Sequence, residues 1–195
     1  NPQPDAAALP LVPFAGRQKA FDHLYHRLTD PEKTDTAVIL GRQHSGKSAL
    51  LHHFHPFFDE SFVSVYVPLR QLPLDNETAW LKALTRLTNT ALTARDFSLA
   101  RLVDKPPTAA NTRLWFANDY LPNVLAVIRR QRQLVYLLDD ADALLHAVGA
   151  GRLPDDTFIF LHELLNSQTQ LHLVLALDAA AEADLPRLSP LAGLT

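Results

Sequence analysis

The chain has 195 residues, of which 47% are hydrophobic, which is enough for one domain with a sizeable core. Its formal net charge of -3 excludes the overall basic field of dedicated nucleic-acid-binding proteins, and the absence of cysteine excludes disulfides, thiolate zinc sites and a cysteine nucleophile. No apolar run approaches the length of a membrane span and no signal segment opens the sequence, so we expect a cytoplasmic protein without membrane contact. Because the chain contains no methionine and begins at Asn1, we also expect a fragment from which a further domain is missing.

The first segments change from irregular to periodic patterns. Four prolines within residues 1–13 predict an extended lead-in. From Arg17 to about Thr29, apolar residues recur at helical spacing and predict an amphipathic helix. The short run Thr36–Leu40 is apolar and β-branched, which is typical of a buried parallel strand.

A complete match to the phosphate-binding pattern G-x-x-x-x-G-K-[ST] follows this strand, at Gly41-Arg42-Gln43-His44-Ser45-Gly46-Lys47-Ser48. Ala49 opens a run to Phe54 that is typical of a helix, so the pattern has the strand-loop-helix context that it requires. The loop would turn its backbone N–H groups toward an anion, and we include Ala49 in the predicted nucleotide-binding set. Lys47 would reach the β- and γ-phosphates, and the Ser48 hydroxyl would bind Mg²⁺. The alternative is a glycine-rich turn before a structural helix.

Strand and helix patterns continue to alternate along the rest of the sequence. Apolar runs predict three more strands, at Phe62–Val67, Leu134–Leu138 and Leu171–Leu177. Helical spacing and capping residues predict helices at residues 76–92, 96–103, 115–128, 142–148 and 155–167. Asn76 is a predicted N-cap, Pro122 either kinks its helix or lies in the first turn, and no element is predicted from Leu185 onward. This alternation predicts an α/β fold of three layers, with a mostly parallel sheet and helices on both faces.

Acidic residues follow the third and fourth predicted strands. Because the carboxyl ends of parallel strands form the ligand-binding edge of such sheets, we expect Asp139, Asp140 and Asp178 near the phosphate loop. Asp139 would hold Mg²⁺, and Asp140 would join Lys47 as a catalytic residue by orienting the attacking water. Capping of the next helix by Asp140 or Asp142 is the alternative. Asp178 is either a γ-phosphate sensor or a solvent-facing residue at a strand end.

A resemblance begins upstream of the phosphate loop. The segment Phe14-Ala15-Gly16-Arg17-Gln18-Lys19-Ala20-Phe21 resembles the F-x-G-R box of STAND and related AAA+ ATPases. The resemblance implies that adenine is enclosed near Phe14 and Gly16, with Arg17 close by, whereas a plain helix start is the alternative for this box.

The order of this box, the phosphate loop, the acidic pair and the fourth strand resembles the nucleotide-binding core of these families over residues 13–178. The resemblance implies a P-loop fold in which the fourth strand lies between the strands that bear Lys47 and Asp139. We place this domain at residues 14–185 and a tail at residues 186–195. Asp178 departs from the polar or arginine-bearing strand end that is usual in these families.

The nucleotide is expected to be ATP with Mg²⁺, because the sequence has no Asn-Lys-x-Asp pattern for guanine. An aspartate at position 140 is shorter than the glutamate often found there, which favours slow hydrolysis. The leading hypothesis is therefore a nucleotide-switch domain of a larger, STAND-like regulatory or signalling protein that binds protein partners or itself. One alternative is an AAA+ ATPase that remodels or loads a partner, on DNA in one version. A second is a degenerate, non-hydrolysing interaction scaffold.

Three further groups of residues have simple structural alternatives. Five histidines could suggest zinc, but no third ligand at helical spacing is visible and surface or partly packed positions are the favoured interpretation: His23, His26, His52, His53 and His55. The basic run at residues 129–132 either contacts nucleic acid or complements the dipole of a helix C-terminus. Arg113, Arg129 and Arg130 are candidate arginine fingers with a solvated helix-end position as the alternative.

Overall fold

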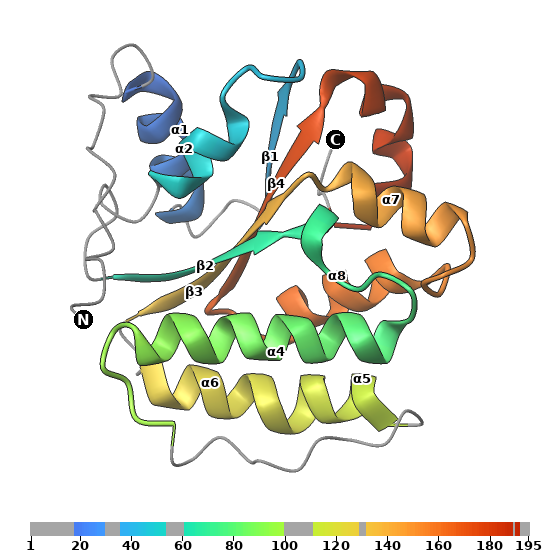
Figure 1. Cartoon of the computed structure of the whole chain (residues 1–195). Helices are drawn as coiled ribbons and strands as arrows, with labels where there is room; N and C mark the ends of the chain where they lie inside the picture. The colour runs from blue at the N-terminus through green and yellow to red at the C-terminus, as the bar shows by residue number, and fades with distance from the viewer. Residues whose placement is uncertain are drawn as a thin grey trace, which may run out of the picture.

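The computed structural model describes residues 18–29, 36–53, 61–99, 111–128, 132–188 and 190–191. Within them, four parallel strands form one sheet in the order β1-β4-β3-β2 (Figure 1). Their bounds are β1 (Thr36–Gly41), β2 (Phe62–Pro68), β3 (Gln133–Asp139) and β4 (Leu171–Asp178). The predicted parallel sheet is confirmed, and so is the placement of the fourth strand between the first and the third.

Helices cover both faces of the sheet because successive side chains of each strand point to opposite sides. In β3, Leu134, Tyr136 and Leu138 belong to one buried cluster, whereas Val135 and Leu137 belong to another. The first cluster includes residues of α4 (Glu77–Thr93), α6 (Leu121–Ile128), α7 (Asp142–Gly149) and α8 (Thr157–Ser167). The second includes residues of α1 (Gln18–Thr29) and α2 (Lys47–His52), above the sheet in Figure 1. This arrangement confirms the predicted three layers.

Strand β1 is less buried than its composition predicts. Thr36 and Ala37 are buried, but Val38 and Ile39 are only partly so, and Leu40 is 43% exposed. β1 lies at one side of the sheet formed by the described residues, so only one of its edges is paired. This position permits the exposure without requiring it, since β2 at the other side is mostly buried. The prediction of a parallel strand is confirmed, and that of a fully buried one is wrong for its carboxyl half.

Helix α4 begins and ends with recognisable caps. Asn76 caps its first turn as predicted, because its side-chain oxygen accepts a hydrogen bond from the Ala79 N–H at 2.9 Å. At the other end, the Phe97 N–H donates to Leu92 O at 3.1 Å, and Asp96 has a left-handed φ of 58°. This closing turn directs the chain out of the helix. The helix predicted at residues 96–103 is therefore wrong for residues 96–99, and residues 100–103 lie outside the described ranges.

Pro122 lies within a continuous helical segment. That segment consists of α5 (Thr112–Trp115), the π-helical turn η3 (Phe116–Tyr120) and α6, in which Pro122 is the second residue. Proline has no N–H to donate and its ring crowds the carbonyl four residues earlier, so a wider turn before it relieves the contact. Pro122 therefore lies in the interior of the predicted helix and not in its first turn, and the π-helical turn before it accommodates the ring.

The chain after β4 is more ordered than predicted. A 3₁₀-helical segment, η4, covers Ala179–Leu188, where no element was expected beyond Leu185. Leu188 and Leu191 are 1% and 2% exposed and belong to the same buried cluster as α4. The predicted lead-in at residues 1–13 lies outside the described ranges. Among the helices of the described residues, none is both long and apolar enough to cross a membrane.

Candidate functional site

The loop between β1 and α2 folds tightly at the carboxyl edge of the sheet. Its Ser45 N–H donates to Arg42 O at 3.1 Å, and φ is positive at His44 (58°) and Gly46 (83°). A Cβ added at Gly41 would lie 2.5 Å from Ser45 Oγ, so glycine permits this close approach. The left-handed conformation at His44 is unfavourable for a non-glycine residue, which is typical of a backbone held in place for function.

Lys47 extends back across this loop. Its Nζ donates hydrogen bonds to the carbonyl oxygens of Gly41 at 2.7 Å and Arg42 at 2.9 Å. These contacts hold the ammonium group at the mouth of the loop, beside Gly46 and Ser48 in the wall of one cavity. The position fits the predicted role of Lys47 toward phosphate oxygens.

A cavity of about 370 Å³ lies between the loop and the carboxyl ends of the strands. This volume is within the usual range for small-molecule sites. Its lining combines loop residues with residues at or just after the carboxyl ends of β2, β3 and β4: Gln43, His44, Ser45, Gly46, Lys47, Ser48, Arg70, Asp140 and Asp178. Gly41, Arg42, Ala49 and Asp139 lie within two residues of a lining residue in the chain but do not line the cavity themselves.

Asp139 lies behind this lining and is 3% exposed. Its Oδ2 accepts a hydrogen bond from the Tyr66 hydroxyl at 2.6 Å, and its Oδ1 accepts one from the Asp140 N–H at 3.1 Å. Burial, followed by the contact with Asp139, raises the pKa of Tyr66 well above its ordinary value, so the hydroxyl remains a donor. Tyr66 was not predicted from the sequence.

Asp140 faces the cavity with a left-handed φ of 53°. Burial raises the pKa of its carboxyl group, and the Arg70 guanidinium opposes this effect. Helix α7 has Ala141 as its N-cap residue, with no side-chain capping bond, so the alternative that Asp140 or Asp142 caps the helix is not supported in the described structure. The side chain of Asp140 remains available to the cavity.

Arg70 is the cavity residue that the sequence analysis missed. It lies in η1 (Leu69–Gln71), directly after β2, where its Nη2 donates to Asp142 Oδ2 at 3.0 Å and its Nε lies 3.6 Å from Asp140 Oδ1. A signal was available, since Arg70 follows the second predicted strand at the same edge of the sheet as the acidic residues.

Asp178 lies at the end of β4, where the sequence predicted either a γ-phosphate sensor or a solvent-facing strand end. It pairs in register with Gly41 at the start of the phosphate loop, and it lines the cavity. Its Oδ1 also accepts a hydrogen bond from the Ala180 N–H at 2.9 Å, which fixes the turn into η4. The strand-end role is therefore supported by a contact, while the sensor role stays a prediction.

Several predicted residues lie elsewhere. Phe14, Gly16 and Arg17, together with His55, Arg129 and Arg130, are outside the described ranges. Arg113 is bonded within the molecule, to Glu77 and through two hydrogen bonds to Asp156, and it lies over the Phe160 ring at 4.7 Å. Among the described residues, no group of three or more His, Asp and Glu side chains forms a metal site, so the zinc hypothesis gains no support.

Comparison with family models finds no match to this sequence, and comparison with curated proteins finds none either. Solved structures do match. A Walker-type ATPase of Pyrococcus abyssi has a TM-score of 0.59 and 14% sequence identity, and the alignment covers 89% of this chain and 47% of that protein.

Two further matches involve ORC proteins. The ORC2 protein of Aeropyrum pernix, solved as ADPNP-ADP complexes, has a TM-score of 0.61 and 14% identity over 96% of this chain and 48% of its own. Drosophila ORC bound to DNA has a TM-score of 0.57 and 13% identity over 87% of this chain and 39% of its own. This chain thus spans less than half of each of these three proteins. At such identities the likeness concerns the fold, and the chain therefore has the α/β fold of P-loop, AAA+-like ATPases.

Proposed function

We propose that this chain is the ATP-binding, slowly hydrolysing switch domain of a larger, STAND-like regulatory or signalling protein. The observation that carries the proposal is a single cavity in which Lys47 and Ser48 of the phosphate loop face Arg70 and Asp140 from other strands. A triphosphate uses all of these groups. Its oxygens would accept hydrogen bonds from the loop N–H groups and from Lys47, while Arg70 would balance charge on the opposite wall.

Two oxygen donors, one in the cavity wall and one directly behind it, fit Mg²⁺. Ser48 offers a hydroxyl oxygen in the cavity wall, and Asp139 offers a carboxylate at the end of β3. Mg²⁺ is commonly held by one or two carboxylates together with phosphate oxygens. Each Asp139 oxygen accepts one hydrogen bond and retains a lone pair for a metal or a metal-bound water. When bound, the ion would neutralise charge on the phosphates.

Asp140 would orient the attacking water. Its side chain is 38% exposed and faces the cavity, which leaves room for a water molecule between it and a bound phosphate. The contribution of the protein to phosphoryl transfer is mainly such positioning. A short side chain held close to Arg70 is less suited to this task than a longer and freer one, so we expect turnover below about 1 s⁻¹.

Adenine is the base that the comparisons favour. The Aeropyrum pernix neighbour is described as ADPNP-ADP complexes. The resemblance of the segment around Phe14 and Gly16 implies that adenine would be enclosed there. Those two residues and Arg17 stay predictions.

A second candidate is an AAA+-type ATPase that loads or remodels a partner on DNA. The observation in its favour is that two of the three structures described above are ORC proteins, one of them bound to DNA. This candidate uses the same cavity and differs in what stimulates turnover.

The test measures ATP turnover of the wild type and of Asp140→Asn, with and without double-stranded DNA. We expect slow wild-type turnover that DNA does not change and a loss of roughly 100-fold in Asp140→Asn. Turnover stimulated by DNA would favour the second candidate. A wild-type protein that binds no ATP in the presence of Mg²⁺ would refute both and leave an interaction scaffold.

A further inference from the structure

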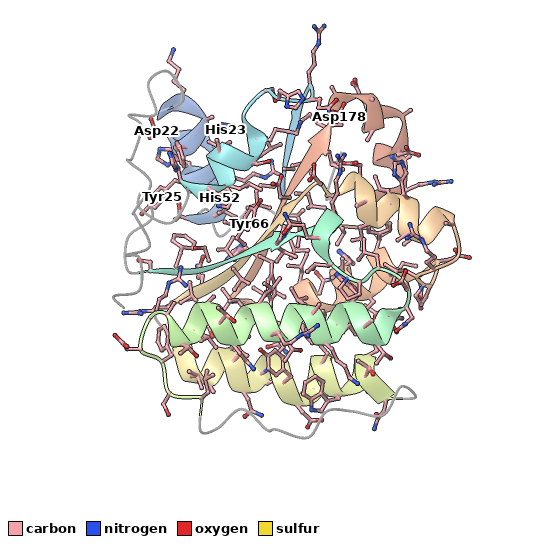
Figure 2. The ribbon with its side chains drawn as sticks, viewed as in Figure 1. Asp22, His23, Tyr25, His52, Tyr66 and Asp178 are labelled. Atoms are coloured by element: carbon pink, nitrogen blue, oxygen red, sulfur yellow. The ribbon has the colours of Figure 1, made fainter. Side chains whose placement is uncertain are left out.

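Tyr66 connects three elements around the predicted metal-holding carboxylate. It lies in β2, two residues before Pro68, which pairs in register with Asp139 of the neighbouring strand. Its hydroxyl donates to Asp139 Oδ2 at 2.6 Å. On its other side, its ring packs against His52 in a tilted arrangement, at a centroid distance of 4.0 Å and an interplanar angle of 33°. Figure 2 shows His52 and Tyr66 side by side, His52 coming from the helix that follows the phosphate loop.

This ring contact connects Tyr66 to the helix that follows the phosphate loop. His52 is four residues after Ser48, and residues at that spacing lie on the same face of a helix. The face of α2 that presents the Ser48 hydroxyl therefore also presents the ring that packs on Tyr66. The two predicted metal ligands, Ser48 and Asp139, are in this way linked through one histidine and one tyrosine.

We propose that Tyr66 is a positioning residue that fixes the orientation of the Asp139 carboxylate for Mg²⁺, an inference that rests on the function proposed above. The Asp140 N–H holds Oδ1 and the Tyr66 hydroxyl holds Oδ2, so the carboxylate plane has a defined direction. Because the ring of Tyr66 is braced by His52, the hydroxyl is itself held in place. Hydrogen-bond partners of ligating groups often set metal affinity in this way.

A positioning role predicts which cation binds more weakly when the Tyr66 hydroxyl is removed. Mg²⁺ requires near-ideal octahedral geometry, whereas Ca²⁺ accepts varied angles and coordination numbers. A carboxylate that is free to rotate should therefore weaken Mg²⁺ binding more than Ca²⁺ binding. Loss of a purely structural contact would instead weaken nucleotide binding equally under all metal conditions.

The experiment uses calorimetric titration of ADPNP into the wild type and Tyr66→Phe, in EDTA, in MgCl₂ and in CaCl₂. In Tyr66→Phe we expect the affinity for ADPNP in EDTA to equal that of the wild type. The increase in affinity that Mg²⁺ produces should be roughly 10-fold smaller than in the wild type. The increase that Ca²⁺ produces should be reduced clearly less. His52→Ala changes an exposed side chain. It should also reduce the increase in ADPNP affinity that Mg²⁺ produces, but by less than Tyr66→Phe does.

Tyr120→Phe is the matched control. It removes a buried tyrosine hydroxyl whose oxygen lies within hydrogen-bonding distance of Thr85 O at 3.0 Å and Asn89 Oδ1 at 2.7 Å, in the layer formed by α4 and η3. We expect this variant to respond to Mg²⁺ as the wild type does. The inference is overturned if Mg²⁺ increases the ADPNP affinity of Tyr66→Phe as much as it does that of the wild type. It is also overturned if Tyr66→Phe binds ADPNP more weakly by the same factor in EDTA, in MgCl₂ and in CaCl₂. A wild type that binds no ADPNP would refute the proposed function first, and this inference with it.

Discussion

Replacement of Lys47 by alanine removes the cation at the mouth of the phosphate loop. A unit charge about 4 Å from a phosphate charge contributes roughly 4 kcal/mol at the effective dielectric of a protein surface. Part of this is offset, because Lys47 already bonds to the carbonyls of Gly41 and Arg42 and must weaken those contacts to reach a ligand. If that exchange costs about 1 kcal/mol, the net effect of about 3 kcal/mol corresponds to roughly 100-fold weaker binding.

Calorimetric titration with ADPNP and Mg²⁺ measures this loss, and thermal unfolding without nucleotide checks that the fold is intact. Lys82→Ala is the control, because it removes the same charge from α4 on the other side of the sheet. We expect unchanged affinity in Lys82→Ala and a melting temperature near that of the wild type in both variants. Wild-type affinity in Lys47→Ala would refute the assignment of the cavity to phosphate.

The other predictions concern the remaining walls of the cavity. Gly41→Ala would place a Cβ 2.5 Å from Ser45 Oγ and should weaken ADPNP binding several-fold by displacing the loop, whereas Gly149→Ala, whose Cβ would lie 3.3 Å from Arg187 Nη1 at the end of α7, should bind normally in the same titration. Arg70→Ala should weaken binding by roughly 10-fold at low salt and less at high salt, since it leaves Asp140 and Asp142 without their cation; a loss that is independent of ionic strength would contradict this. Because burial raises the pKa of Asp140, its protonation favours the folded state, and stability associated with this group declines as pH rises through its folded pKa. Asp140→Asn should therefore raise the melting temperature slightly at pH 7 while it abolishes most turnover, and a lower melting temperature would show that the pair with Arg70 outweighs the burial.

The sequence predicts the parts of this molecule whose cause is local. The phosphate loop is a contiguous pattern between a strand and a helix, and its cavity-lining residues were found in this way. The same holds for Asn76, since an N-cap acts within one helical turn. The position of β4 between β1 and β3 followed from the resemblance and not from any periodicity, because hydrophobic runs do not specify which strands pair.

Features that depend on strand register or on sheet edges could not be predicted. The contact between Tyr66 and Asp139 joins residues 73 positions apart and requires that β2 pair with β3. The partial exposure of Leu40 requires that β1 be outermost among the described strands, which its apolar composition does not indicate. The false helix at residues 96–103 has a different cause: the pattern continued, but the left-handed turn at Asp96 had already ended the helix.

The charges around the cavity explain how an acidic strand end can coexist with a phosphate site. Asp178 beside a triphosphate would be repulsive unless a cation intervened. Among the described residues, Arg70 lines the same cavity and is attracted electrostatically to Asp178 as well as to Asp140 and Asp142. Lys47 supplies a second cation from the loop. The cavity is therefore a site of balanced charge, and phosphate oxygens entering it would compete with carboxylates for Arg70. Removing Arg70 should accordingly expose the repulsion from Asp178, so the double variant Arg70→Ala with Asp178→Asn should recover part of the affinity that Arg70→Ala loses.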